Sequence, residues 1–465
     1  MTETVTSDRE SPTVRAEDGH IAPEFLAEIT EALEAADRAA LSALVAPLHE
    51  ADLADVLEAL KTEQRHLMVQ LLGPEFDFLA LTEVDDAVRD EILELLPTAA
   101  VAEGVRDLDT DDAIHILEDL EERERTDILA RIPATERATL RRSLEYPEET
   151  AGRRMQSEFI AVPPFWTVGQ TIDYMRESDD LPDDFYEIFI IDPAFRPLGT
   201  VSLNHLLRTK RPVEMQAIME PEIYTVDATD DQEEVARTFE RYDLVSAAVI
   251  DESGRLVGVI TVDDIIDVIE EEADEDIRLL GGVGDEEISD SVLTTTRSRF
   301  IWLLINLGTA ILASGVISLF DATIEQMVAL AVLMPIVASM GGNAGTQTMT
   351  VAVRAIATGD LARFNVRRII TRETLVGFVN GCLFAVIMGA IAGLWFGNAE
   401  LGGVIGVAMV VNLVAAGLSG ILIPIVLNRL TLDPALASAV FVTTITDVVG
   451  FFAFLGLAAW WFGLV

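Results

Sequence analysis

The stretch that decides the fold is FIWLLINLGTAILASGVISLF, residues Phe300–Phe320, which contains no charged residue. An apolar helix of about 20 residues crosses the ~30 Å hydrocarbon core of a membrane. Four further stretches of this kind follow it, namely Met327–Val353, Thr374–Asn398, Leu401–Leu427 and Pro434–Val465. Residues 297–465 are therefore predicted to form a transmembrane domain with five helices.

The arginines of this half predict its orientation. The loops Asp321–Gln326 and Gly397–Gly403 contain none, whereas the loops that alternate with them do. Positively charged loops remain in the cytoplasm. We therefore expect a multi-pass protein of the inner or plasma membrane, with a cytoplasmic N-terminus and the C-terminus outside. The arginines concerned are Arg297, Arg299, Arg354, Arg363, Arg367, Arg368, Arg372 and Arg429.

The charge is divided unevenly between the two halves. Residues 1–296 contain 24 basic and 72 acidic residues, whereas residues 297–465 contain 8 Arg and 7 Asp or Glu. A soluble half with this charge repels nucleic acid and anionic lipid headgroups and attracts cations. Nucleic-acid binding is therefore excluded as a function.

The numbers of lysines and cysteines indicate the environment of the protein and exclude some kinds of site. Lys61 and Lys210 are the only lysines, and an acidic, lysine-poor surface is typical of the cytoplasmic proteins of salt-loving microbes, so we hypothesise a halophile. Cys382 is the only cysteine, which excludes an intrachain disulfide and a cysteine-based zinc cluster.

The soluble half begins with a polar, acidic segment, residues 1–23, which we predict to be a disordered tail. Residues 24–145 show apolar residues at helical spacing, with Pro97 and Pro133 between the repeated units. An all-α helical-repeat domain that acts as a scaffold is predicted. The related phrases are Leu48–Leu60 (LHEADLADVLEAL), Leu108–Leu120 (LDTDDAIHILEDL) and, more loosely, Leu81–Leu96.

Residues 146–261 show an α/β pattern that occurs twice. Glu187–Asp192 (EIFIID) with Pro197–Leu207 (PLGTVSLNHLL) parallels Ser246–Asp251 (SAAVID) with Leu256–Ile266 (LVGVITVDDII). Each copy gives strand, turn, strand and helix. This order resembles a tandem pair of CBS domains, small modules that commonly sense nucleotides or ions.

An acidic helix and linker, residues 262–296, join the two halves. In VDDIIDVIEEEADEDIRLL, residues Val262–Leu280, nearly all polar side chains are carboxylates. Like charges three and four residues apart destabilise an isolated helix. The pattern therefore indicates either a solvated face in a cation-rich cell or a helix that cations hold against another part of the protein.

One carboxylate is expected near the middle of the membrane, Asp447 in Val442–Gly450 (VTTITDVVG). A lone carboxylate in lipid costs ~3 kcal/mol or more, so it faces a protein interior or a water-filled path. Ala439, Thr443 and Thr444 share its helical face. We interpret this face as pore-lining; the alternative is an Asp that serves packing alone.

A second polar group is predicted in the membrane, in Gly341–Gln347 (GGNAGTQ). Asn343 and Gln347 offer oxygen ligands four residues apart, although close helix packing explains the glycines equally well. The chain has no histidine beyond His205, which excludes an intramembrane HExxH metalloprotease. Oxygen ligands suit hard ions such as Mg²⁺, and a two-fold dimer supplies two copies of Asp447 to an ion that keeps most of its waters.

Several of these motifs together resemble the MgtE family of magnesium channels over essentially the whole chain. The helical domain runs into Tyr146–Met155 (YPEETAGRRM), and the acidic helix is similar to the family's plug helix. GGNAGTQ is similar to its second membrane helix. Asp433–Leu436 (DPAL), with Thr446 and Asp447, is similar to its fifth membrane helix. Some members have Asn eight residues before the pore Asp, where this chain has Ala439.

The resemblance implies a homodimer whose pore holds hydrated Mg²⁺ at Asp447, and a cytoplasmic part through which Mg²⁺ closes that pore. It also implies an ATP site as an option at the CBS pair. The carboxylates that match the family's regulatory ligands are Asp231, Glu233, Asp243, Asp263, Asp264, Asp267, Glu272, Glu275, Asp276 and Asp433.

The sequence therefore predicts a multidomain membrane protein that acts as a Mg²⁺-gated magnesium channel or transporter and is not an enzyme. One alternative is a proton- or Na⁺-coupled divalent cation exporter, in which Asp447 carries a proton. Another is a membrane sensor without transport, whose CBS pair signals to a partner.

Overall fold

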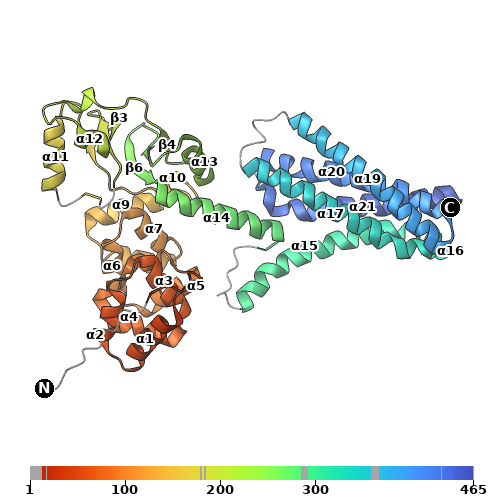
Figure 1. Cartoon of the computed structure of the whole chain (residues 1–465), viewed down its shortest axis with the longest axis horizontal. Helices are drawn as coiled ribbons and strands as arrows, with labels where there is room; N and C mark the ends of the chain where they lie inside the picture. The colour runs from red at the N-terminus through yellow and green to blue at the C-terminus, as the bar shows by residue number, and fades with distance from the viewer. Residues whose placement is uncertain are drawn as a thin grey trace, which may run out of the picture. The chain divides into compact units, whose positions relative to one another are not determined.

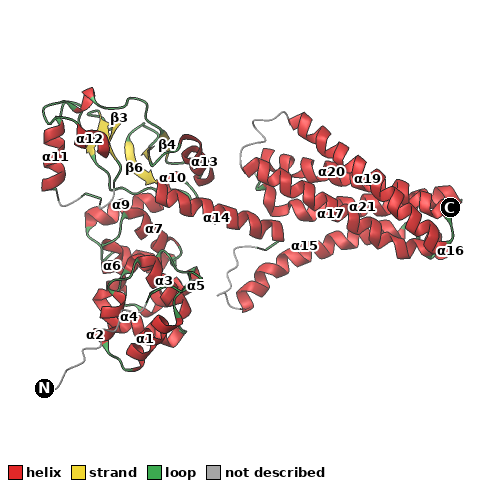
Figure 2. Cartoon of the chain, in the orientation of Figure 1, coloured by secondary structure: helices red, strands yellow, loops and turns green. Residues whose placement is uncertain are grey.

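The computed structural model describes residues 13–16, 18–178, 181–182, 185–283, 292–357, 366–430 and 432–463 (Figures 1 and 2). The described chain forms two compact units, of which the first ends at Glu270 and the second begins at Glu271. The first twelve residues of the predicted tail and most of the predicted linker after Val283 lie outside the described residues.

The first unit begins with a domain of short helices, as the repeated phrases predict. Asp37 caps α2 by accepting a hydrogen bond from the backbone N–H of Ala40 (3.1 Å), and Pro97 and Pro133 directly precede α6 and α9. The elements are α1 (Pro23–Glu34), α2 (Arg38–Val45), α3 (Glu50–Ala59), α4 (Thr62–Leu72), η1 (Gly73–Glu75), η2 (Phe78–Leu81), α5 (Asp86–Leu95), α6 (Thr98–Arg106), α7 (Thr110–Glu118), α8 (Glu122–Leu129) and α9 (Ala134–Leu144).

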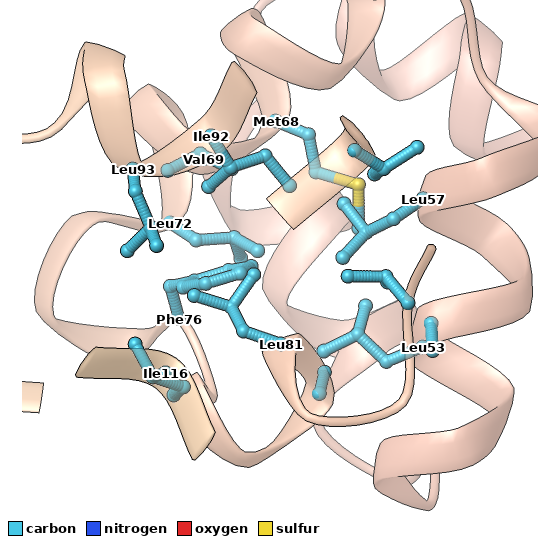
Figure 3. Close-up of a cluster of buried hydrophobic side chains, with 14 of the residues drawn as sticks. Leu53, Leu57, Met68, Val69, Leu72, Phe76, Leu81, Ile92, Leu93 and Ile116 are labelled. Atoms are coloured by element: carbon cyan, nitrogen blue, oxygen red, sulfur yellow. The ribbon is translucent and has the colours of Figure 1, made fainter. Parts of the chain in front are cut away.

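A single apolar core holds these helices together. Leu53 and Leu57 from α3 meet Met68 and Leu72 from α4 and residues of α5 and α7 (Figure 3). Ordered contacts begin before α1, since Arg15 forms ion pairs with Asp52 (2.6 Å) and Asp55 (2.7 Å).

Two three-stranded sheets follow, with the same strand order and pairing in each. In both, the first strand pairs parallel and the third antiparallel with the central strand. This confirms the predicted repeat. The elements are α10 (Ala151–Arg154), β1 (Ala161–Val162), α11 (Val168–Glu177), β2 (Glu187–Ile191), β3 (Pro197–Ser202), α12 (Leu203–Arg208), η3 (Met215–Ala217), β4 (Thr225–Asp227), α13 (Gln232–Tyr242), β5 (Ser246–Ile250) and β6 (Leu256–Thr261).

The acidic stretch is one helix, α14 (Val262–Gly281). Its first residues belong to the first unit, where Ile265 and Val268 pack into the core of the second sheet. Its last residues belong to the second unit, where Leu279 packs with Met349 and Val442.

Within its described residues, the second unit contains five helices that are long and apolar enough to cross a membrane, as predicted. The segment Asp321–Gln326, predicted as a loop, is the short helix α16, which Phe320 begins by accepting hydrogen bonds from Thr323 and Ile324. The long helices are α15 (Val292–Ser318), α17 (Ala329–Ala357), α19 (Val366–Phe396), α20 (Ala399–Arg429) and α21 (Pro434–Phe462).

Glycines allow the long helices to approach closely. A Cβ atom on Gly377 of α19 would lie 2.5 Å from the carbonyl oxygen of Leu413 in α20, and one on Gly381 would lie 2.9 Å from Val410 Cα. Helix α20 packs against α17, α19 and α21. It therefore forms the centre of the second unit and packs against both helices that carry the predicted pore residues.

Candidate functional site

The predicted membrane site lies where α17 contacts α21. A Cβ atom on Gly345 would lie 2.4 Å from Val442 Cγ1, and one on Gly342 would lie 3.9 Å from Thr443 Cγ2. These glycines belong to GGNAGTQ, and the side chains they contact belong to VTTITDVVG. The structure therefore brings the two predicted motifs together along one helix seam.

Asp447 is half-buried in the middle of α21. One turn earlier, the hydroxyl of Thr443 donates to the carbonyl of Ala439 (2.9 Å), and that of Thr444 donates to the carbonyl of Val440 (2.6 Å). A hydroxyl that donates to its own helix leaves oxygen lone pairs for another donor or a cation. This face of α21 therefore offers oxygen acceptors beside a carboxylate.

The two amide side chains of GGNAGTQ are more exposed than Asp447. Asn343 and Gln347 are exposed on α17, and Asn343 Nδ2 lies 3.4 Å from the hydroxyl of Ser339. Within the described part of the chain, no hydrogen bond connects either amide to Asp447. Ala439 packs beside the cluster of Met349 and Val442 and offers no polar side chain.

A second group of acidic side chains lies in the first unit, at the start of two helices. Asp111 and Asp112 are in the first turn of α7, and Asp264 is in the first turn of α14. Asp264 accepts hydrogen bonds from Thr261, from the hydroxyl at 2.7 Å and from the backbone N–H at 3.2 Å. Among the described residues, Asp111 Oδ1 is buried and has no hydrogen-bond partner.

The electrostatics of these three carboxyls differ from those of the acidic surface. Burial, then the charges of Asp264 and Asp112, raise the pKa of Asp111 well above its usual range. Burial and the charge of Asp264 raise the pKa of Asp112 to about 7. Burial also raises the pKa of Asp264, against the hydrogen bonds from Thr261. Like charges this close require a proton or a cation between them.

This group is an incomplete metal centre by itself. Among the residues that the structure describes, no set of three or more His, Cys, Asp or Glu side chains has the geometry to hold a metal ion. A hard cation beside Asp111 and Asp264 would therefore complete its shell with water, which Mg²⁺ does readily.

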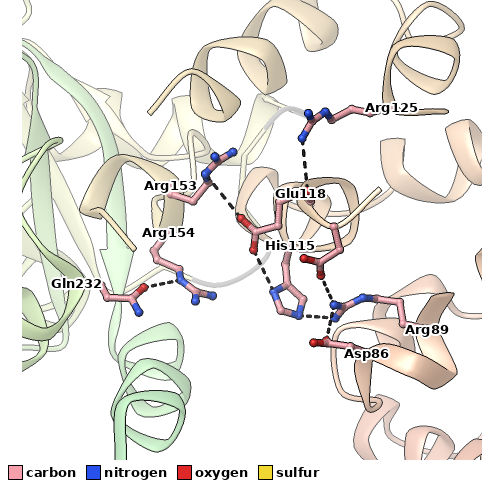
Figure 4. Close-up of polar contacts among 9 residues, drawn as sticks. Asp86, Arg89, His115, Glu118, Arg125, Arg153, Arg154 and Gln232 are labelled. Atoms are coloured by element: carbon pink, nitrogen blue, oxygen red, sulfur yellow. Dashed lines mark hydrogen bonds and ion pairs between the residues drawn. The ribbon is translucent and has the colours of Figure 1, made fainter. Parts of the chain in front are cut away.

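Polar contacts join the helical domain to the CBS pair beside this group (Figure 4). Arg153 Nε lies 3.6 Å from Glu118 Oε2, and Arg154 Nε donates to Gln232 Oε1 (2.9 Å). His115 Nε2 lies 2.8 Å from a guanidinium nitrogen of the buried Arg89. Because arginine only donates, this ring nitrogen accepts, and His115 Nδ1 carries the hydrogen that faces Glu118.

Glu118 is the centre of this network. Burial raises the pKa of its carboxyl, but the hydrogen bond from His115 and the charge of Arg154 outweigh burial and lower the pKa overall. Arg153 and Arg154 are part of YPEETAGRRM. This motif therefore ties α7, which carries Asp111 and Asp112, to the CBS pair.

Three carboxylates predicted as regulatory ligands have structural contacts in the second CBS copy. Asp231 caps α13 by accepting from the backbone N–H of Glu233 (3.0 Å), Glu233 pairs with Arg237, and Asp243 ends the helix with a positive φ of 52°. Asp433 caps α21 by accepting from the N–H of Ala435 (2.6 Å). Their roles as metal ligands stay a prediction, as do those of the remaining carboxylates on α14, Asp263, Asp267, Glu272, Glu275 and Asp276.

Asp111 and Asp112 were not among the residues predicted as ligands. A signal was present, because the phrase Leu108–Leu120 contains three aspartates at the start of a helix, and carboxylates there are favoured by the helix dipole. Their approach to Asp264, however, is a tertiary contact that neither segment encodes alone.

Comparison with known proteins decides the family. Three family profiles match the chain: "MgtE intracellular N domain" over residues 48–149, "CBS domain" over 215–271 and "Divalent cation transporter" (MgtE) over 334–457. The protein "Magnesium transporter MgtE" of Thermus thermophilus is 33% identical over 443 residues, which cover 92% of this chain and 97% of that protein. The chain belongs to the MgtE family of magnesium transporters.

Other MgtE relatives agree. The Bacillus subtilis protein of the same name is 31% identical over 76% of this chain and 78% of its own length, and the Enterococcus faecalis protein is 34% identical over 70% and 72%. With five candidate membrane helices, the chain is a multi-pass membrane protein.

Two solved structures resemble the soluble half. One, described as the soluble part of a magnesium transporter, has a TM-score of 0.50 and 25% identity and covers 54% of this chain and 98% of that one. The other, the cytosolic domain of the Mg²⁺ channel MgtE in complex with ATP, has a TM-score of 0.50 and 30% identity, with 52% and 99% covered.

Proposed function

We propose that this MgtE protein is a Mg²⁺-gated magnesium channel, in which hydrated Mg²⁺ passes Asp447 in a pore on the axis of a homodimer. The observation that supports it most is the half-buried carboxylate of α21 beside a seam of glycines. A carboxylate inside a membrane unit marks an ion path more often than a packing contact.

The chemistry of this face suits a hydrated divalent ion. The carboxylate of Asp447 and the hydroxyl oxygens of Thr443 and Thr444 accept hydrogen bonds, and the waters around Mg²⁺ are strong donors. Because Mg²⁺ dehydrates reluctantly, contacts through its waters are enough to hold it. A two-fold axis along this face doubles the number of carboxylates.

The regulatory half of the proposal rests on Asp111, Asp112 and Asp264. Cytoplasmic Mg²⁺ that binds beside these carboxyls removes the repulsion between α7 and the start of α14. A ligand shifts an equilibrium through its different affinities for two states. The state in which these helices meet is therefore favoured by Mg²⁺, and we propose that this state closes the pore.

We further propose that the N-terminus is cytoplasmic, that the C-terminus is outside, and that the CBS pair binds ATP, as the cytosolic domain of the MgtE relative does. Tyr224 and Tyr242 form an exposed aromatic pair in the second CBS copy, with centroids 4.5 Å apart. Such a pair offers a purine ring a stacking surface.

The test is Mg²⁺ flux into liposomes that contain the purified protein. Asp447→Ala should lose nearly all flux and Asp447→Asn most of it, while both remain folded dimers, because the substitutions remove charge without opening a large cavity. Asp321→Asn, which changes an exposed carboxylate of the same unit, is the matched control and should transport normally. Wild-type flux in Asp447→Ala would disprove the pore assignment.

The same assay separates the alternatives. Flux that follows a proton or Na⁺ gradient rather than the Mg²⁺ gradient would favour the coupled exporter. No flux from any preparation of folded wild-type protein would favour the sensor.

A further inference from the structure

Asn412 is a buried polar side chain at the centre of the membrane unit. It lies near the middle of α20 and is 0% exposed. An amide buried among apolar helices costs stability unless its hydrogen bonds are made. Asn412 lies on α20, which packs against both α17 and α21. The stability cost of this amide therefore needs an explanation.

The contacts of Asn412 reach the two helices that carry the predicted pore residues. Its Nδ2 donates to the carbonyl of Val337 in α17 (2.8 Å). A Cβ atom on Gly341 of α17 would lie 2.2 Å from this nitrogen, and one on Gly450 of α21 would lie 2.7 Å from it. The amide thus fills a notch that one glycine from each helix leaves open.

This notch lies beside the proposed ion path. Gly341 is two residues before Asn343, on the opposite side of α17, and Gly450 is three residues after Asp447, so each lies within one helical turn of a pore residue. The amide of Asn412 therefore contacts both pore-bearing helices at the level of these pore residues.

The turn of α17 that accepts this hydrogen bond, at Val337, has weak helix-forming residues on both sides. Pro335 has no N–H and removes one hydrogen bond from the helix, and Gly341 and Gly342 are poor helix formers. Val337 lies between them. The hydrogen bond from Asn412 therefore adds a tertiary contact to this segment of α17.

The carbonyl oxygen of the Asn412 amide argues against a role in stability alone. Among the described residues, Asn412 Oδ1 is buried and has no hydrogen-bond partner. A leucine has nearly the same shape and would fill the notch without a lone polar atom. A buried polar group that costs stability is better explained by a role in position than by one in packing.

We propose that Asn412 is a positioning residue that fixes Asn343 on α17 relative to Asp447 on α21 and so sets the preference for Mg²⁺ over larger divalent ions. The inference rests on the proposed pore. Mg²⁺ holds its six waters in near-ideal octahedral geometry, whereas Ca²⁺ accepts variable geometry. A pore with loosened walls therefore loses Mg²⁺ preference before it loses conduction.

The test compares Mg²⁺ and Ca²⁺ flux in liposomes for the full-length protein. Asn412→Leu keeps the shape and removes the donor, and Asn428→Ala changes an exposed asparagine of the same helix as the control. We expect Asn412→Leu to melt at the wild-type temperature or above, with Mg²⁺ flux reduced by at least about fivefold. The ratio of Mg²⁺ to Ca²⁺ flux should fall by about threefold or more, and Asn428→Ala should be unchanged.

A second experiment tests the packing of Asn412 against Gly341 by enlarging one side chain and then shrinking the other. Gly341→Ala should lower the melting temperature and the flux because its Cβ collides with the amide, and adding Asn412→Ala should restore the melting temperature but not the ion preference. Wild-type flux and ion ratio in Asn412→Leu would overturn the proposal, as would an equal loss of Mg²⁺ and Ca²⁺ flux. Wild-type flux in Asp447→Ala would instead disprove the pore, whatever Asn412 variants do.

Discussion

Asp112→Asn is the substitution whose effect the structure predicts most directly. The carboxyl of Asp112 shares its surroundings with Asp111 and Asp264, and its pKa is raised from 3.8 to about 7. A carboxyl whose pKa is raised on folding costs no stability below its unfolded pKa, and the folded state loses stability as the pH rises from 3.8 to about 7. Without divalent ions, the soluble half is therefore expected to be less stable at pH 8 than at pH 5.

The size of the stability loss follows from the shift in the pKa of Asp112. At 1.36 kcal/mol per pKa unit the ionised carboxyl costs about 4 kcal/mol in all, of which about 2.7 kcal/mol is lost between pH 5 and pH 8. Solvent screening at this partly exposed group reduces that part to about 1.4 kcal/mol. For a unit of this size the melting temperature changes by about 2–4 °C per kcal/mol, which gives about 3–6 °C. Asparagine stays neutral, so Asp112→Asn should avoid this loss.

The assay is thermal unfolding of the full-length protein in detergent, followed by far-UV circular dichroism at pH 5 and pH 8, with EDTA or Mg²⁺. In EDTA at pH 8 the Asp112→Asn protein should melt above wild type, and the difference should be smaller at pH 5. Mg²⁺ should stabilise wild type at pH 8 more than the variant. Asp274→Asn, which changes an exposed carboxylate of α14, is the control and should follow wild type. If Asp112→Asn lost as much stability as wild type between pH 5 and pH 8, the predicted repulsion would be refuted.

Three further predictions concern the soluble half. Millimolar Mg²⁺ should protect α14 and the CBS pair from protease more than K⁺ at matched ionic strength, because divalent ions bridge carboxylates; equal protection by K⁺ would indicate screening alone. Replacing Asp263, Asp267, Glu272 and Glu275 together with Ala should leave the channel open in liposome flux at Mg²⁺ levels that close wild type, and closure at the same or lower Mg²⁺ would show that they do not sense the ion. Arg89→Ala should destabilise the helical domain in urea unfolding by about 2–4 kcal/mol, because Asp86 and Asp119 lose their buried partner; Arg125→Ala, whose partner Glu122 is exposed, should cost under about 1 kcal/mol. Similar losses for both arginines would contradict this assignment.

Hydropathy predicted the membrane helices but not where they end. Helix α19 begins at Val366, whereas the apolar stretch was predicted to begin at Thr374. Arg367, Arg368 and Arg372 lie in this first part. A helix continues into water wherever its backbone hydrogen bonds are made, but hydropathy detects only the part inside the apolar layer. The start of α15 at Val292 and the end of α17 at Ala357 extend beyond the predicted stretches for the same reason.

The repeats of the soluble half were predictable because each copy has its own local pattern. The strand pairs and the turn between them recur with the same spacing, and the structure gives both sheets the same register, including the irregularity after Ile190 and after Val249. The first strand of the first sheet is short, since β1 contains only Ala161 and Val162. A strand of two residues is sufficient at this edge of the sheet because β1 pairs with β2 alone.

The sequence singles out the membrane carboxylate more clearly than the carboxylates of the soluble half. Asp447 stands out in the sequence because the membrane makes any carboxylate exceptional. In a half with 72 acidic residues, no composition argument separates Asp111 and Asp112 from their neighbours. Asn412 was also missed, since one amide in an apolar helix has no pattern until its neighbours are known.

The continuity of α14 has a mechanical consequence. Its 20 residues contain no proline, and no glycine before Gly281, so the helix is a rod about 30 Å long. A rod turns a tilt of about 5° at one end into a displacement of about 3 Å at the other. Its stiffness, however, depends on the ions around it, because unscreened carboxylates weaken the turns that carry them. We therefore expect cations to act on this helix in two ways, by shifting its position and by making it stiffer.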